Sequence, residues 1–218
     1  MSDIITQMNN VLSGYDNPRI LLHSCCAPCS SYCLLCLREC ANITTFFYNP
    51  NITDEKEYIK RRDELLRLIE AYNNTDYRLP EECRQVNIKN TYVNKIDNLE
   101  SGFEPKLFFE KTKGLEACPE RGERCSVCFE LRLRETALRA KENGYDLFAT
   151  TLTLSPLKNA ALINEIGERI GKEVNITYLP TDFKKKNGYK MSIELSKEYN
   201  LYRQNYCGCV YSQRDRQE

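Results

Sequence analysis

The chain has 218 residues, with 31 basic and 31 acidic side chains and a single histidine. This length suits one large domain, or a domain with an insertion, and allows a sizeable core. The balanced charge excludes a strongly basic nucleic-acid binder and a membrane-surface protein. No apolar run approaches the roughly 20 residues of a membrane helix, and the N-terminus lacks a signal-peptide core, so we expect a cytoplasmic protein without a membrane partner.

The content of twelve cysteines is high for such a chain. In a reducing compartment, cysteines at this density are more often metal ligands or redox thiols than disulfides. His23 is the only imidazole, so a metal site would be rich in thiolates, and zinc sites of the two-histidine kind are excluded.

The first cysteine group follows a short apolar run, Ile20, Leu21 and Leu22, which predicts a buried strand over about 19–24. Cys25, Cys26 and Cys29 come next, and Pro28 opens a helix over about 28–40. A loop between a strand and a helix N-terminus is where open α/β sheets bind ligands, and the helix end favours thiolates. This loop is therefore a candidate metal or redox site.

Four cysteines, at 29, 33, 36 and 40, lie on one stripe of that helix. One interpretation is a wire of four thiols. We instead expect Cys33, Cys36 and Cys40 to pack as small hydrophobic residues against the sheet. The isolated Cys83 and Cys118 are also expected to be packing residues.

The remaining pattern alternates strands with helices. We expect strands at about 43–48, 146–151 and 174–179, and helices at about 54–73, 125–143, 157–171 and 191–201. This succession predicts a parallel α/β sheet with right-handed crossovers. Residues of about 74–124 are interpreted as a partly helical insertion, and the basic residues 60–62 as a solvated face.

Two further cysteine pairs occur late in the chain. Cys125 and Cys128 form a Cys-x-x-Cys at the start of a helix, which places both thiols on one face and is also found in zinc knuckles and thioredoxin-type pairs. Cys207 and Cys209 flank Gly208 in a C-terminal tail of about 202–218, where the glycine permits a tight fold. This last pair suits a structural zinc clip or a second redox-active metal.

These seven thiols exceed the four that one tetrahedral zinc ion accepts, so the chain holds either two metal centres or one centre and free thiols. All-thiolate ligation favours iron–sulfur or zinc over copper or magnesium. A set of four, Cys25, Cys26, Cys125 and Cys128, would satisfy a [4Fe–4S] cluster. Cys29, Cys207 and Cys209 would remain for a separate ion.

The loop over residues 180–190 is polar and basic and follows a predicted strand. Lys184, Lys185, Lys186 and Lys190 are candidates to contact nucleic-acid phosphate, and Tyr189 is a candidate to stack on a base. The alternative is a hydrated surface loop.

Several motifs together resemble the QueH-type epoxyqueuosine reductases across residues 21–212. They are Leu-Leu-His-Ser-Cys-Cys-Ala-Pro-Cys-Ser, Arg-Cys-Ser-Val-Cys, Thr-Thr-Leu-Thr-Leu-Ser-Pro, Asp-Phe-Lys-Lys and Tyr-Arg-Gln-Asn-Tyr-Cys-Gly-Cys. The resemblance implies a Rossmann-like fold akin to the adenine-nucleotide alpha-hydrolase (HUP-like) group, a [4Fe–4S] cluster and an adjacent mononuclear iron. It also implies reduction of the epoxide of epoxyqueuosine, at the wobble position of tRNA, to queuosine.

This reaction removes the epoxide oxygen as water and consumes two electrons and two protons. A cluster passes electrons singly, and an adjacent Lewis-acidic iron would assist. His23 or Tyr206 is the expected proton donor, although His23 is equally suited to orient the loop by hydrogen bonding. The electron donor and the oligomeric state are not evident from the sequence.

Three alternatives stay open. An ATP-dependent thiolase of similar fold would need a Ser-x-Gly-rich phosphate cradle, which the first strand-end loop lacks. A zinc-stabilised RNA-binding module would have no catalysis. A thiol oxidoreductase would keep its activity after metal removal.

Overall fold

A five-stranded sheet with all strands parallel forms the centre of the computed structural model, which describes residues 3–87, 90 and 92–214. The strand order is β3-β2-β1-β4-β5. The strands are β1 (Arg19–His23), β2 (Asn42–Phe46), β3 (Ile96–Leu99), β4 (Leu147–Thr150) and β5 (Thr177–Tyr178). The predicted parallel α/β fold is therefore confirmed.

Strand β1 lies in the middle of the sheet because its side chains are apolar on both faces. Ile20 and Leu22 point into one core cluster and Leu21 into the other, and all three are fully buried. His23 pairs in register with Phe46 of β2 and Thr150 of β4, so the three strands end at the same edge. At this carboxyl edge lie the loops in which open parallel α/β sheets bind their ligands.

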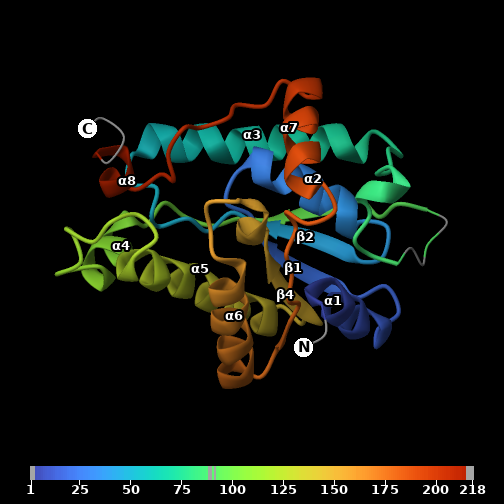
Figure 1. Ribbon diagram of the computed structural model, residues 1–218, viewed down its shortest axis with the longest axis horizontal. Coiled ribbons are helices and arrows are strands. Elements are labelled where there is room, and N and C mark those ends of the chain that lie inside the picture. The colour runs from blue at the N-terminus through green and yellow to red at the C-terminus, as the bar shows by residue number, and fades with distance from the viewer. Residues whose placement is uncertain (1–2, 88–89, 91, 215–218) are drawn as a thin grey trace.

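Helices cover both faces of the sheet (Figure 1). On one side lie α2 (Ala27–Leu37), α3 (Glu55–Asn73) and α7 (Gly188–Glu198), and on the other lie α5 (Glu123–Glu142) and α6 (Ala160–Val174). Three shorter helices complete the fold: α1 (Ile4–Ser13), α4 (Pro105–Lys111) and α8 (Val210–Arg214). Two 3₁₀ turns span Glu81–Cys83 and Thr151–Leu154.

The segment expected to be an insertion contributes a strand to the sheet. Within about 74–124, β3 pairs with β2, with Ile96 opposite Ile43 and Leu99 opposite Phe46. The sequence pattern missed β3 because it is an edge strand in which only Ile96 is buried. The segment also contains α4, so the prediction that it is partly helical is confirmed.

Helix α6 continues past the expected end at Gly171. It ends at Val174, and Asn175 follows with a left-handed backbone (φ 59°). Gly171 serves packing instead, because a Cβ there would lie 2.7 Å from the carbonyl oxygen of Ile176. The expected range of 157–171 therefore ended this helix about one turn too early.

The cysteines expected on one helical stripe belong to the core, although α2 ends at Leu37 and Cys40 lies in the turn after it, so the expected helix end at about 40 was wrong. Cys33, Cys36 and Cys40 are at most 2% exposed and pack in the same cluster as Ile20 and Leu22. Cys83 joins that cluster, whereas Cys118 is half-buried in the loop before α5. The packing interpretation of the stripe and of Cys83 is confirmed.

Among the residues that the structure describes, no helix has both the length and the apolar character needed to span a membrane.

Candidate metal centre

Three thiols converge directly after β1. The sulfur atoms of Cys25, Cys26 and Cys29 all lie within 4.8 Å of one another, and those of Cys25 and Cys26 are 3.9 Å apart. The short turn between His23 and the first turn of α2, where Pro28 lies, produces this convergence. The Thr151 hydroxyl also accepts a hydrogen bond from the Cys25 N–H at 3.2 Å. We call these residues the three-thiol group.

The three thiols of this group differ in pKa. Hydrogen bonds from Cys26 and Cys29 lower the pKa of Cys25, and the same contacts raise the pKa of Cys26, to about 12, and the pKa of Cys29. Without metal, one thiolate is therefore held by two thiols. Metal binding must displace the remaining protons.

Four further thiols, which we call the four-thiol group, line a second cavity. Cys125 and Cys128 come from the first turns of α5, and Cys207 and Cys209 come from the tail. Burial raises the pKa of Cys128 to about 12 and also raises the pKa of Cys125 and Cys209. Cys125, Cys128 and Cys209 therefore keep their protons in the metal-free protein.

The tail is shaped to present its two cysteines. Gly208 has a φ of 120°, and a Cβ there would lie 2.8 Å from Ile52, so the position requires glycine. The Ser212 hydroxyl accepts from the N–H of Cys207 at 3.0 Å, and the Ser212 N–H donates to the sulfur of Cys209 at 3.3 Å. Residues 215–218 of the expected tail lie outside the described residues.

The two groups are neighbours. Cys25, Cys29 and Cys207 line a larger cavity of about 160 Å³, and Cys207 also lines the cavity of the four-thiol group. Glu120 and Arg132 likewise line both cavities. The structure thus brings together cysteines from three distant parts of the chain.

Arg61 fastens the tail to α3. Its side chain is 2% exposed, pairs with Glu57 at 2.7 Å, and donates to the carbonyls of Cys207 at 3.1 Å and Tyr206 at 3.4 Å. The interpretation of residues 60–62 as a solvated face was therefore wrong for Arg61. Arg62, which is 43% exposed and pairs with Asp63, does face solvent.

His23 is completely buried between two strands. Its Nε2–H donates to the carbonyl of Tyr48 at 3.0 Å, so Nδ1 accepts from the Thr150 hydroxyl at 2.9 Å. Burial, followed by the charge of Arg132, lowers the pKa of His23 to about 3. The imidazole is neutral and fully hydrogen-bonded, which suits an orienting role.

Tyr206 lines the larger cavity, with the Arg61 guanidinium 5.0 Å from its ring centre. Burial, followed by the charge of Glu57, raises the pKa of its phenol, so the phenol keeps its proton at neutral pH. Lys158 and Arg203 line the same cavity. Burial alone would lower the pKa of Lys158, but the electrostatic influence of nearby cysteines, above all Cys207, raises it, so its amine stays charged.

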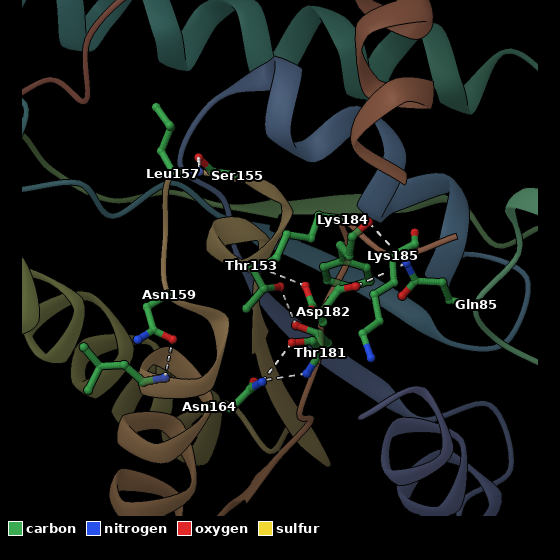
Figure 2. Close-up of polar contacts among 12 residues, drawn as sticks. Gln85, Thr153, Ser155, Leu157, Asn159, Asn164, Thr181, Asp182, Lys184 and Lys185 are labelled. Atoms are coloured by element: carbon green, nitrogen blue, oxygen red, sulfur yellow. Dashed lines mark hydrogen bonds and ion pairs between the residues drawn. The ribbon is translucent and has the colours of Figure 1, made fainter. Parts of the chain in front are cut away.

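The loop after β4, which borders the larger cavity, is tied to the loop after β5 by hydroxyl and amide contacts (Figure 2). The hydroxyls of Thr153 and Thr181 are 2.7 Å apart, and Asn164 bonds both the N–H and the carbonyl of Thr181. The loop after β4, which carries Ser155 and Lys158, is thereby held against the loop after β5.

The expected nucleic-acid contacts occupy two different places. Tyr189 lines the larger cavity, whereas Lys184 pairs with Asp182 at 3.0 Å and Lys185 pairs with Asp3, both away from the cavity lining. The Gln85 side chain holds their loop by donating to the carbonyls of Asp182, Phe183 and Lys185 (Figure 2). The role of the three residues in binding RNA stays a prediction.

Sequence reasoning gave no role to several charged residues that line the two cavities. Among them are Glu120, Arg124, Arg132, Lys158 and Arg203. A usable signal existed for Arg124 and Arg132, because each lies four residues from Cys128 and therefore on its face of α5.

The chain matches known proteins over most of its length. The family described as epoxyqueuosine reductase QueH matches residues 20–215. The QueH of Staphylococcus epidermidis is 43% identical over 199 residues, spanning 90% of this chain and 77% of that protein. The QueH of Streptococcus pyogenes is 44% identical over 195 residues, with 89% and 70% covered, and the QueH of Staphylococcus aureus is 40% identical over 226 residues, with 96% and 88% covered. The chain therefore belongs to the QueH family of epoxyqueuosine reductases.

Proposed function

We propose that this chain reduces the epoxide of epoxyqueuosine, at the wobble position of tRNA, to the cyclopentene of queuosine, using a [4Fe–4S] cluster and an adjacent mononuclear iron. The observation that carries the proposal is that the cavities beside the two thiol groups are neighbours, with Cys207 and Arg132 in the lining of both. Family membership indicates the reaction, and the thiols supply ligands for both metals.

The three-thiol group fits one ion. Sulfur ligands about 2.3 Å from a tetrahedral ion lie about 3.8 Å apart. The sulfur atoms of Cys25 and Cys26 are 3.9 Å apart and Cys29 lies within 4.8 Å of both. Three thiolates leave one position for a further ligand, and Cys25 and Cys29 both line the larger cavity.

The four-thiol group fits the cluster, which takes four cysteine ligands. Its members surround a cavity of their own instead of meeting at one point. This grouping differs from the partition expected from the sequence, in which Cys25 and Cys26 join Cys125 and Cys128. That partition stays a prediction, and the geometry supports the grouping proposed here.

Bound at these thiols, the cluster would supply single electrons and the iron would act as a Lewis acid. The chain itself must supply protons and exclude water. Tyr206 carries a phenolic proton at the wall of the larger cavity, and we assign it as the proton donor. His23 acts indirectly, by fixing the strand ends from which the three-thiol group emerges.

The tRNA would present its wobble base extruded from the anticodon loop, as sequence-specific RNA recognition commonly requires. Tyr189 offers a ring for stacking in the larger cavity, and Lys158 and Arg203 offer positive charge beside it. Because the net charge of the chain is zero, such a local patch must hold the phosphates.

The test is anaerobic purification with iron and sulfide analysis, followed by incubation with epoxyqueuosine tRNA and a reductant. We expect a brown protein that absorbs at about 400 nm and forms queuosine. A cluster-replete sample that forms none would reject the proposal. A colourless zinc protein that binds the tRNA without turnover would identify an RNA-binding module instead.

A further inference from the structure

A tight turn places Glu120 at the wall of both cavities. The turn runs from Pro119 to Gly122, and the N–H of Gly122 donates to the carbonyl of Pro119 at 3.1 Å. Arg121, its third residue, has a φ of 74°, a left-handed backbone that glycine adopts far more readily than arginine. The N–H of Arg121 also donates to the sulfur of Cys125 at 3.2 Å. Strain of this kind persists only where the surrounding structure holds it, and it is concentrated at functional sites.

Glu120 is the only carboxylate among the described residues that line the larger cavity. Its side chain is half-buried and forms no ion pair or hydrogen bond within the described ranges. The same cavity is lined by three basic side chains that have no carboxylate partner in the described part of the chain, namely Arg132, Lys158 and Arg203. A cation that enters this cavity is repelled by the basic residues and attracted by the single acid.

Epoxyqueuosine carries such a cation close to its reacting carbons. The cyclopentane ring that bears the epoxide is joined to the 7-deazaguanine base through a secondary amine, and the ring carbon that holds this nitrogen is bonded to the epoxide. Aliphatic amines have pKa values above about 7, so the nitrogen is an ammonium at neutral pH. A residue that binds it must lie beside the metal-binding thiols, and Glu120 lines the cavities next to both thiol groups.

We propose that Glu120 binds the ammonium group of the modified wobble base and thereby selects tRNAs in which this base carries an amine. This inference rests on the proposed function for the identity of the substrate. The ammonium donates an N–H to the carboxylate, and such a charge-assisted hydrogen bond is stronger than one between neutral groups. Because the nitrogen lies next to the epoxide, the contact also directs the epoxide toward the thiols.

Two other roles of Glu120 give different expectations. A carboxylate that only offsets the neighbouring basic residues would act on every tRNA alike, and its removal would strengthen phosphate binding whether or not the base is modified. A carboxylate that binds iron would lose the iron when it is replaced. Only ammonium binding makes the effect depend on the amine of the base.

The experiment compares three tRNAs that differ only at the wobble position, where they carry guanine, 7-aminomethyl-7-deazaguanine or queuosine. The second has an amine without the cyclopentene ring, and queuosine, the product, keeps the amine of the substrate. Wild type, Glu120→Gln and Glu120→Asp are tested, with Glu123→Gln as the matched control. Glu123 is exposed in the first turn of α5 and lines neither cavity. Filter binding with metal-loaded protein, whose iron and sulfide are determined, gives the dissociation constants.

We expect wild type and Glu123→Gln to bind the two amine-bearing tRNAs about tenfold more tightly than the guanine form, as one hydrogen bond between charged groups would provide. Glu120→Gln should bind all three tRNAs alike, and Glu120→Asp should keep part of the preference. An undiminished preference in Glu120→Gln would overturn the proposal.

Two further outcomes would also overturn it. If Glu120→Gln loses the preference for queuosine only, the carboxylate contacts the ring hydroxyls and not the ammonium. If Glu120→Gln loses iron while its circular dichroism stays that of the wild type, the carboxylate is a metal ligand. The proposed function is tested separately: a loaded wild type that prefers the amine-bearing tRNAs but forms no queuosine from epoxyqueuosine tRNA would refute the reaction and leave the ammonium site in place.

Discussion

Arg61 donates a hydrogen bond from Nη1 to the backbone carbonyl of Cys207 at 3.1 Å, across 146 positions of sequence. The same guanidinium reaches the carbonyl of Tyr206 and pairs with Glu57. One side chain of α3 therefore fixes a cysteine, Cys207, that lines both cavities. Over residues 202–214, the part of the tail that the structure describes, there is no strand, and this contact holds the cysteines of the tail beside those of α5.

Replacing Arg61 by methionine should release the tail. The Glu57 side chain is only 12% exposed and would lose its cationic partner. We therefore expect the free energy of unfolding to fall by about 3–5 kcal/mol. We also expect less iron per chain and faster proteolysis near residues 203–206. Urea unfolding, iron analysis and limited digestion measure these effects.

Arg62→Met is the matched control, since Arg62 is the adjacent arginine on the same helix and pairs with Asp63 at the surface. It should change the free energy of unfolding by less than about 1 kcal/mol and leave iron binding intact. Equal effects of the two substitutions would contradict the conclusion that Arg61 holds the tail against α3.

His23 should make the metal-free protein less stable as the pH falls. Its pKa is about 3 in the folded chain and near 6.5 when unfolded, so the unfolded state binds the extra proton between these values. Stability is fully present above pH 6.5 and declines below it by up to about 1.4 kcal/mol per pH unit. His23→Gln should lack this slope between pH 6.5 and 5, above the range where most carboxylates titrate. Chemical unfolding at a series of pH values measures it, and an identical slope in the variant would show that other groups are responsible.

Much of the fold and part of the site could be read from the sequence because local patterns encode them. Residues close together in the sequence were enough to recognise the apolar run of β1, Pro28 at the start of α2 and the Cys-x-x-Cys of α5. Strand β3 was missed because its register depends on pairing with β2 and not on its own polar residues. Arg61 was misplaced because its burial depends on a tail 146 positions away. Convergence of this kind is a property of the tertiary fold.

The two thiol groups should respond differently to single substitutions. Cys128→Ser should remove both iron and sulfide, because the four-thiol group is proposed to hold the cluster. Cys26→Ser should lower iron while sulfide stays near the wild-type level. Iron and acid-labile sulfide per chain, measured after anaerobic reconstitution, separate the two cases. Loss of sulfide in Cys26→Ser would support the partition expected from the sequence, with Cys25 and Cys26 as cluster ligands.

Cys36→Ala is the matched control for the cysteine substitutions. Cys36 is 2% exposed in the core, on the face of α2 that packs against its neighbours. The substitution removes one buried sulfur, so we expect a loss of roughly 1 kcal/mol in stability with wild-type iron and sulfide. A large loss of iron from this variant would mean that the stripe takes part in metal binding.

Binding of tRNA should depend more on Lys158 than on Lys185. Lys158 lines the larger cavity and keeps its charge, whereas Lys185 already pairs with Asp3 outside that cavity. We expect Lys158→Gln to weaken binding several-fold and to reduce the slope of log K against log salt by roughly one. Lys185→Gln should leave both quantities near the wild-type values, because its charge is partly neutralised before RNA arrives. Filter binding at several salt concentrations, with metal-loaded protein, measures both variants. If Lys185→Gln instead gives the larger loss, the RNA backbone crosses the loop after β5, and the contacts predicted there from the sequence would be the principal ones.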